Sequence, residues 1–293
     1  MRRPAAVLCA GAAHWDIIGR TPVALPHGAD VPGRISRRPG GVALNIALAL
    51  AALHRPVALI AAIGADLAGG DLAALITAAG IDGTGLYHHP GTSDCYVAIE
   101  DRNGALHAAV ADCSGLEAVG LSLLAPLHDG RLATPWHGQI VIDGNLPAPV
   151  LHALLTDSAT TDAPLALVPA SPRKAAWLAP LLATRPLTLY LNRREAEVLC
   201  GQPFADSSAA AKALVGRGAA EAVVTDGSAA VAVATPGGCL TLQPPPITVL
   251  SVTGAGDAFV AAHLAARADG LDREAALGEA LGASARHVAR EEP

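Results

Sequence analysis

Short apolar runs alternate with longer helical patterns along most of the chain, and this alternation constrains the fold more than any other feature. A strand that is apolar along its whole length is buried on both faces, as in parallel sheets covered by helices. The pattern predicts an α/β fold with a mainly parallel, doubly wound sheet. The candidate strands are residues 6–10, 57–62, 139–142, 165–168, 187–191 and 222–225, and the candidate helices are 42–53, 71–79, 148–156, 173–183, 193–200 and 207–217.

One segment interrupts the alternation. Two apolar runs, 95–100 and 106–111, flank a turn that contains Asn103-Gly104, the dipeptide that best tolerates the positive φ angles of a tight hairpin. Residues 15–38 are rich in Pro, Gly and Arg and show no helical periodicity. We expect one domain over residues 1–293, with a small β-lid from about 15–38 and 92–112 above the carboxyl edge of the sheet. The alternative is a surface hairpin without function.

Composition excludes several classes of function. A net charge of −6 without a basic run argues against nucleic acid and against anionic membranes as partners. The longest uncharged stretch, residues 39–54, is too short to span a bilayer, and the N-terminal apolar run is interpreted as a core strand rather than a signal peptide. Five cysteines without a C-x-x-C pair indicate a reducing, cytoplasmic setting. The expected partner is a small molecule.

The most informative motif is Thr253-Gly254-Ala255-Gly256-Asp257, which leads into the helical pattern of residues 259–268. Glycines at the start of a helix leave backbone N–H groups open to an anion. In the functional interpretation, these N–H groups hold a transferring phosphoryl group while the carboxylate takes a proton from an attacking hydroxyl. In the structural interpretation, the carboxylate only stabilises the positive end of the helix dipole.

Other phosphate-binding motifs do not occur in the sequence. The chain has two lysines, Lys174 and Lys212, and neither belongs to a G-x-x-x-x-G-K-[ST] loop. The H-R-D and D-F-G tripeptides of protein kinases do not occur either. Phosphate chemistry in this chain would therefore depend on a helix N-terminus and a metal.

A second motif, Gly40-Gly41 followed by Asn45, precedes and enters the predicted helix of residues 42–53. Glycines there let a polar ligand approach the backbone, and the Asn45 amide can offer a donor and an acceptor to hydroxyl groups. Alone, the motif is a common junction between a loop and a helix. Together with residues 253–257 it favours a binding site.

These two motifs, in this order, resemble the two signatures of the PfkB (ribokinase-like) family of carbohydrate and nucleoside kinases. The similarity extends from about Val7 to about Ala285. It implies a ribokinase-like fold with a small β-lid, ATP and Mg²⁺ as cofactors, and a hydroxymethyl group on a nucleoside or sugar as the acceptor. The lid is also our candidate surface for a homodimer.

The resemblance also implies roles for individual residues. Asp257 would be the catalytic base, and the amides of Gly254, Ala255 and Gly256 would form the anion hole. The residues implied to bind the acceptor are Asp16, Gly41 and Asn45.

On the nucleotide side, Asn192-Arg193-Arg194-Glu195 resembles the N-x-x-E motif of the family. Through it, Asn192 and Glu195 would act on Mg²⁺-bound water, which suits a cation that keeps its hydration shell. The same residues fit a capping box, and both interpretations can hold. Thr225 and Gly227 resemble the turn that contacts the nucleotide phosphates.

The chain departs from the family pattern at three places. His14 stands where many relatives have Asn, and Ser251 stands where many have an Asp that helps to bind a monovalent cation. The chain ends at Pro293, soon after the helical pattern of residues 274–289, and we expect it to lack the usual final loop and strand of the family. We therefore expect weak or no potassium activation, and the adenine-side wall is not assigned.

Within the family, three stretches resemble the pseudouridine kinases most: residues 40–47, 143–147 and 252–258. The corresponding reaction is ATP-dependent phosphorylation of the 5′-hydroxyl of pseudouridine. Ribose, another nucleoside or another sugar are alternative acceptors. A catalytically silent nucleoside- or sugar-binding protein is the alternative from another class.

Overall fold

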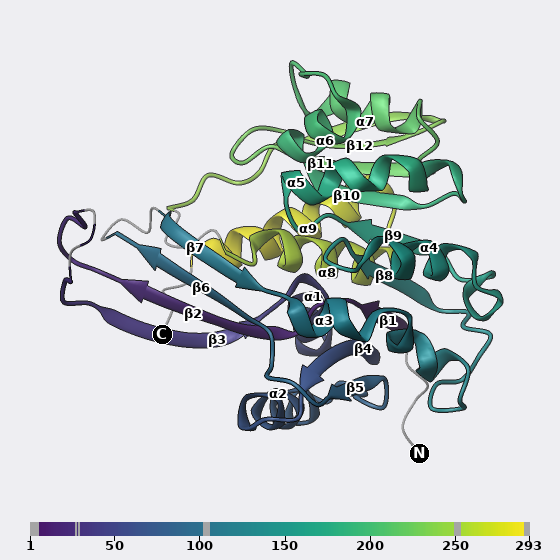
Figure 1. Cartoon of the computed structure of the whole chain (residues 1–293). Coiled ribbons are helices and arrows are strands. Elements are labelled where there is room, and N and C mark those ends of the chain that lie inside the picture. Colours follow the sequence, from purple (N-terminus) through teal and green to yellow (C-terminus); the bar gives the residue numbers. More distant parts are fainter. Residues whose placement is uncertain (1–5, 27, 29, 102–105, 249–252, 290–293) are drawn as a thin grey trace.

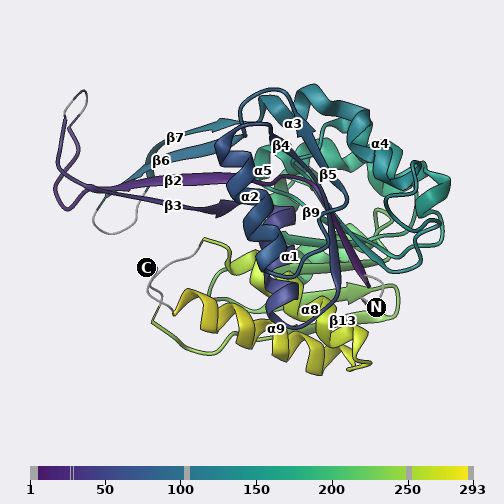
Figure 2. The same cartoon turned by 90° about the horizontal axis from the view of Figure 1, so that it is seen from below.

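The computed structural model describes residues 6–26, 28, 30–101, 106–248 and 253–289. Within them the chain forms a large sheet between two layers of helices, and a small sheet that projects from one edge (Figures 1 and 2). The large sheet has the strand order β13 (Gly238–Leu242), β12 (Val231–Thr235), β11 (Glu221–Thr225), β10 (Thr188–Asn192), β9 (Leu165–Val168), β8 (Gln139–Asp143), β1 (Val7–Ala10), β4 (Val57–Gly64) and β5 (Leu86–His89).

The large sheet is mainly parallel, as predicted. Its neighbouring strands pair in parallel from β11 to β5, while β12 and β13 pair antiparallel at one end. The sequence analysis did not predict β5, β12 or β13. Strand β1 lies between β4 and β8, so the chain order reverses there. Ligands bind outside the carboxyl ends of parallel strands at such a switch point.

Helices cover both faces of this sheet. One face packs against α1 (Val42–Ala52), α2 (Leu67–Ala78), α8 (Ala255–Ala268) and α9 (Arg273–Val288). The other packs against α3 (Ser114–Val119), α4 (Ala148–Thr156), α5 (Pro172–Ala175), α6 (Arg193–Cys200), α7 (Ser207–Val215) and the 3₁₀ segments η1 (Gly120–Leu127), η2 (Ser158–Thr160) and η3 (Ala176–Ala183). Consecutive residues of β1 point to opposite faces: Val7 and Cys9 join the first core, Leu8 and Ala10 the second. Burial on both faces explains the continuous apolar strands.

Two helix predictions were wrong in detail. Helix α2 begins at Leu67, four residues earlier than predicted, because the Asp66 side chain accepts a hydrogen bond from Gly69 N and caps the helix. The predicted helix of residues 173–183 is one α-helical turn, α5, followed by the 3₁₀ segment η3. Pro180 lies inside η3 and has no N–H for an α-helical ladder.

The small sheet is the predicted β-lid. It has the order β3 (Arg34–Gly40), β2 (His14–Arg20), β6 (Cys95–Glu100) and β7 (Leu106–Asp112), and it extends away from the helices (Figure 1). Strands β6 and β7 form the predicted antiparallel hairpin, whereas β2 and β6 pair in parallel. The Asn103-Gly104 turn lies outside the described residues.

Two carboxylates, Asp66 and Asp94, hold the lid to the main body. Asp66 accepts hydrogen bonds from Ser93 N and Ser93 Oγ, at 3.0 and 2.6 Å, just before β6 begins. Asp94 accepts from Gly115 N at 2.8 Å and from Leu116 N at 3.1 Å, just after β7 ends. Both connections of the hairpin are therefore fixed, while its strands project outward. No helix in the described chain is long and apolar enough to cross a bilayer.

Candidate active site

The acceptor-side and phosphate-side motifs meet at one hydrogen bond. Asn45, in the first turns of α1, donates from Nδ2 to Asp257 Oδ2 over 2.9 Å, although the two residues lie 212 positions apart in the sequence. Helices α1 and α8 lie side by side on the same face of the sheet, which brings these side chains together (Figure 2). The structure thus places the candidate base in contact with a candidate acceptor-binding residue.

The environment of Asp257 favours its protonated form. Burial raises the pKa of its carboxyl to about 7, and the negative charges of Asp143, Asp16 and Glu195 act in the same direction. The hydrogen bond from Asn45 opposes this rise because it stabilises the carboxylate. A pKa near 7 is well matched to general base catalysis at neutral pH.

The two glycines beside Asp257 have different surroundings. Gly254 is the N-cap of α8 with φ 77°, and a Cβ there would lie 3.0 Å from His287 Nε2. His287 Nε2 is also 2.7 Å from the carbonyl oxygen of Thr253. At Gly256, no heavy atom outside the adjacent residues and the local helix backbone lies within 4 Å of the position that a Cβ would take. The first turn of α8 is therefore closed on the side of Gly254 and open at Gly256.

The Gly40-Gly41 pair packs closely against the loop before Asp16. A Cβ on Gly40 would lie 2.2 Å from Asp16 Oδ1, and one on Gly41 would lie 2.3 Å from the carbonyl oxygen of Ala12. Gly41 also has φ 97°, which favours glycine. The pair thus has a steric role besides any ligand contact. Asp16 is buried, and its Oδ1 lies 3.2 Å from His14 Nε2.

A second buried carboxylate, Asp143 at the end of β8, joins these loops. Its Oδ2 accepts hydrogen bonds from Ala12 N at 2.9 Å and Ala43 N at 3.2 Å, and its Oδ1 accepts from Asn145 N at 2.7 Å. Its side chain is inaccessible to solvent, and burial raises its pKa. Sequence reasoning assigned it no role. The available signal was a lone acid directly after an apolar strand.

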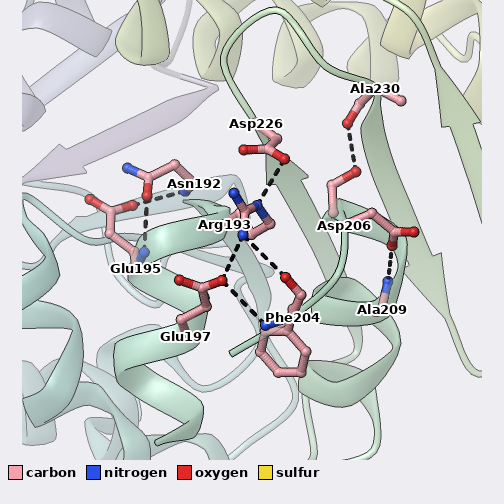
Figure 3. Close-up of polar contacts among 10 residues, drawn as sticks. Asn192, Arg193, Glu195, Glu197, Phe204, Asp206, Ala209, Asp226 and Ala230 are labelled. Atoms are coloured by element: carbon pink, nitrogen blue, oxygen red, sulfur yellow. Dashed lines mark hydrogen bonds and ion pairs between the residues drawn. The ribbon is translucent and has the colours of Figure 1, made fainter. Parts of the chain in front are cut away.

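Asn192 and Glu195 form the expected capping box at the start of α6 (Figure 3). Glu195 N donates to Asn192 Oδ1, and Asn192 N donates to Glu195 Oε2, both over 2.9 Å. Glu195 is buried, and burial raises its pKa to about 7. Asn192 Nδ2 and Glu195 Oε1 take no part in these two hydrogen bonds. The structural interpretation is therefore confirmed, and a second role toward a metal is still compatible with the geometry.

The predicted phosphate turn, Thr225 to Gly227, is held against the same helix. Arg193 Nε pairs with Asp226 Oδ2 at 2.8 Å, and Arg193 Nη1 pairs with Glu197 Oε1 at 2.7 Å (Figure 3). Thr225 and Asn192 are paired neighbours at the ends of β11 and β10. The sequence analysis assigned no role to Arg193 or Asp226, because a local pattern does not show a pairing between residues 33 positions apart.

Two neighbouring cavities lie at the first turn of α8. The smaller, about 130 Å³, is lined by Asn192, Glu195, Thr225, Gly256 and Asp257, together with apolar residues. The larger, about 720 Å³, has Thr225 and Gly256 in common with it and extends toward residues 244–247 and helix α9. Its lining includes Pro244, Pro245, Pro246, Ile247, Leu281, Ser284, Ala285 and Val288. A large, mainly apolar space beside a small one that is lined in part by polar side chains is suited to a nucleotide base and its phosphates.

The described residues contain no group of three or more His, Cys, Asp or Glu side chains arranged to hold a metal directly. A cation bound through water needs fewer protein ligands, and Asn192 and Glu195 beside the smaller cavity fit that mode. Ser251, the residue at the family's cation position, lies outside the described residues.

The family follows from comparison with known proteins. The model of the pfkB family of carbohydrate kinases matches residues 5–292, and the chain belongs to this family. It is 29% identical to the pseudouridine kinase of Escherichia coli K12 over 283 residues, which cover 92% of this chain and 86% of that protein.

Solved structures agree with this assignment. A carbohydrate kinase from Agrobacterium tumefaciens has a TM-score of 0.80 and 30% sequence identity, with coverage of 95% of this chain and 89% of that chain. A putative ribokinase II from Escherichia coli, solved with ATP and Mg²⁺, has a TM-score of 0.81 and 17% identity, over 99% of this chain and 94% of that chain. The predicted ribokinase-like fold and the kinase class are confirmed.

The Asn45–Asp257 contact predicts a change in ionisation. In Asn45→Ala the carboxylate loses a donor, so we expect the pKa of Asp257 to rise above its value of about 7. The carboxyl ¹³C shift of Asp257, followed from pH 5 to 9 and assigned with Asp257→Asn, measures this change. A midpoint at or below that of the wild type would contradict the prediction.

Proposed function

We propose that this chain transfers a phosphoryl group from ATP to the 5′-hydroxyl of pseudouridine, with Asp257 as the general base. The observation that supports this most strongly is the hydrogen bond between Asn45 and Asp257, since it joins the expected acceptor site to the helix expected to receive the phosphoryl group. The similarity to a pseudouridine kinase over 92% of the chain supports the acceptor.

In this mechanism each part of the site has a separate task. Asp16, Gly41 and Asn45 bind the ribose hydroxyls, and Asp257 takes the proton of the 5′-hydroxyl as its oxygen attacks the terminal phosphorus. The amides of Gly254, Ala255 and Gly256 stabilise charge on the transferring group, because they lie at the open N-terminus of a 14-residue helix. Asp257 must be ionised to act, so activity rises with pH through about 7.

The nucleotide binds in the paired cavities of this proposal. Its base occupies the larger cavity, between residues 244–247 and α9, and its phosphates lie against Thr225, Gly227 and Gly254. Mg²⁺ neutralises charge on the phosphates when bound. Glu195 and Asn192 would orient its water ligands. Burial raises the pKa of the Glu195 carboxyl, and a nearby cation would favour its charged form.

The lid has two tasks in the proposal. The face that carries Asp16 lies over the acceptor and excludes water from the reaction. On the opposite face, the paired residues Ile35, Val97, Ile99 and Val110 leave 40–80% of each side chain exposed. We propose that this apolar face pairs with a second copy of the chain.

The cytoplasm is the proposed setting, and the five free thiols are consistent with it.

Asp257→Asn is expected to lower kcat by about 10² to 10⁴, the range for a lost general base, while pseudouridine still binds. Calorimetric titration of the variant, beside steady-state kinetics, separates the two effects. Activity within about tenfold of the wild type would remove Asp257 from this role.

Glu195→Gln is expected to raise the Mg²⁺ concentration for half-maximal rate more than it raises the KM for the acceptor. Glutamine still caps the Asn192 N–H, so the substitution removes mainly the charge. Exposed Glu279 on α9 provides the control Glu279→Gln. An unchanged magnesium titration would leave Glu195 with its capping role alone.

Pseudouridine is expected to have the highest kcat/KM among pseudouridine, uridine, cytidine, adenosine and ribose, with phosphate on the 5′ oxygen of the product. A site that hydrogen-bonds a group of the acceptor can reject an analogue without it by as much as about 10⁴-fold. Coupled ADP release measures the rates, and ³¹P NMR locates the phosphate. A tenfold preference for ribose or an N-linked nucleoside would contradict this acceptor but not a kinase. Ligand-dependent thermal shifts without ADP release would indicate a silent binding protein.

Val110→Lys is expected to weaken self-association, because it places a charge in the apolar lid face, where Val110 is 70% exposed. Sedimentation velocity of the wild type and the variant at matched concentrations tests this. A wild type that is monomeric at micromolar concentration would rule out the proposed dimer.

A further inference from the structure

Lys174 and Asn145 form a polar pair that the site described above does not use. Lys174 Nζ donates a hydrogen bond to Asn145 Oδ1. The two residues follow β9 and β8, which are neighbouring strands, so the pair lies at the same edge of the sheet as Asp257. Both side chains are half-buried, and Lys174 is one of only two lysines in the chain.

The pair is fixed relative to the acceptor side of the site. Asn145 N donates to the buried Asp143 carboxylate, which also accepts from Ala12 N and Ala43 N. Ala12 precedes the strand that carries Asp16, and Ala43 belongs to the helix that carries Asn45. One carboxylate therefore links Lys174, through Asn145, to the elements that hold both proposed ribose-binding side chains.

Lys174 also lies near the base of the lid. Burial raises the pKa of the Cys113 thiol, directly after β7, and the ammonium of Lys174 opposes that rise. Helices α3 and α5 cover the face of the sheet opposite α1 and α8. Helix α5 with Lys174 therefore lies on the opposite face of the sheet from Asn45 and Asp257, and the Lys174 side chain reaches the sheet edge at Asn145. A nucleoside whose ribose contacts α1 could extend its base across that edge toward Lys174.

The hydrogen-bonding capacity of an ammonium group restricts the kind of ligand atom that Lys174 can bind. It donates up to three hydrogen bonds and accepts none. Within the described part of the chain, Asn145 is its hydrogen-bond partner, which leaves two N–H groups for a ligand. The ribose hydroxyls already have partners in the proposed mechanism, namely Asp16, Gly41 and Asn45. The remaining group of a nucleoside substrate that accepts hydrogen bonds but donates none is a ring carbonyl, as in uracil.

We propose that Lys174 determines acceptor specificity by donating a hydrogen bond to a ring carbonyl oxygen of the acceptor's base, with Asn145 holding the ammonium in place. This assignment rests on the proposed nucleoside acceptor. A phosphate oxygen is the competing ligand, but the hydrogen-bond connections of Lys174 run to β8 and β1, whereas the proposed phosphate contacts belong to β11 and α8.

The test compares pseudouridine with ribose, an acceptor without a base, in the wild type, Lys174→Met and Lys174→Arg. We expect Lys174→Met to lower kcat/KM for pseudouridine by about 10- to 150-fold, as when a hydrogen bond to a charged group is lost, and to change that for ribose by less than about threefold. Lys174→Arg should recover part of the loss. Lys212→Met, at an exposed position of α7, is the control and should change neither.

Asn145→Ala keeps Lys174 but removes its hydrogen-bond partner. It should therefore lower kcat/KM for pseudouridine less than Lys174→Met does, and it should likewise leave kcat/KM for ribose nearly unchanged. Unfolding temperatures of all variants exclude general destabilisation. A loss equal for both acceptors, or a matching rise in the KM for ATP, would overturn the assignment in favour of phosphate. A wild type that prefers ribose would contradict the proposed function, whereas an unselective Lys174→Met in a pseudouridine-preferring enzyme would contradict only the role of Lys174.

Discussion

The arrangement of the site depends on one buried carboxylate, Asp143. It lies at the switch point of the sheet and accepts three backbone hydrogen bonds from three separate segments. An unpaired charge would be very costly at a position inaccessible to solvent, so the three donors are fixed as firmly as the carboxylate itself. Gly11 is part of this arrangement, because a Cβ there would lie 2.2 Å from Asp143 Cβ. Close packing and the hydrogen bonds to Asp143 therefore fix the conformation of these loops before any ligand binds.

The same carboxylate shapes the electrostatics of the site. Asp16, Asp143, Glu195 and Asp257 converge at one edge, and each of the other three raises the pKa of Asp257. Such a concentration of acids is unfavourable for an isolated protein and favourable for one that binds a cation. In the proposed mechanism it also keeps Asp257 available as a base near neutral pH. Burial and the neighbouring negative charges together produce this raised pKa.

The sequence predicted the parts of the fold that follow from local periodicity. The six apolar runs are strands of the large sheet, and the Asn-Gly hairpin belongs to the lid. Strands β12 and β13 were missed because they form a short antiparallel edge without helices between them. The motif residues were found because glycine and acid patterns are local. Asp143 and Lys174 were not assigned, since their importance arises from contacts between distant segments.

In the proposed mechanism, the hydrogen bond between Asn45 and Asp257 couples acceptor recognition to the ionisation of the base. Position 41 requires glycine, because its φ is positive and the carbonyl oxygen of Ala12 is too close to allow a Cβ. That constraint fixes the start of α1, and α1 in turn places the Asn45 amide on Asp257. The Asn45 amide lowers the pKa of Asp257, which burial would otherwise raise further. In the proposed mechanism, a displacement of α1 would therefore weaken acceptor binding and raise the pKa of Asp257, so both functions depend on the same few contacts.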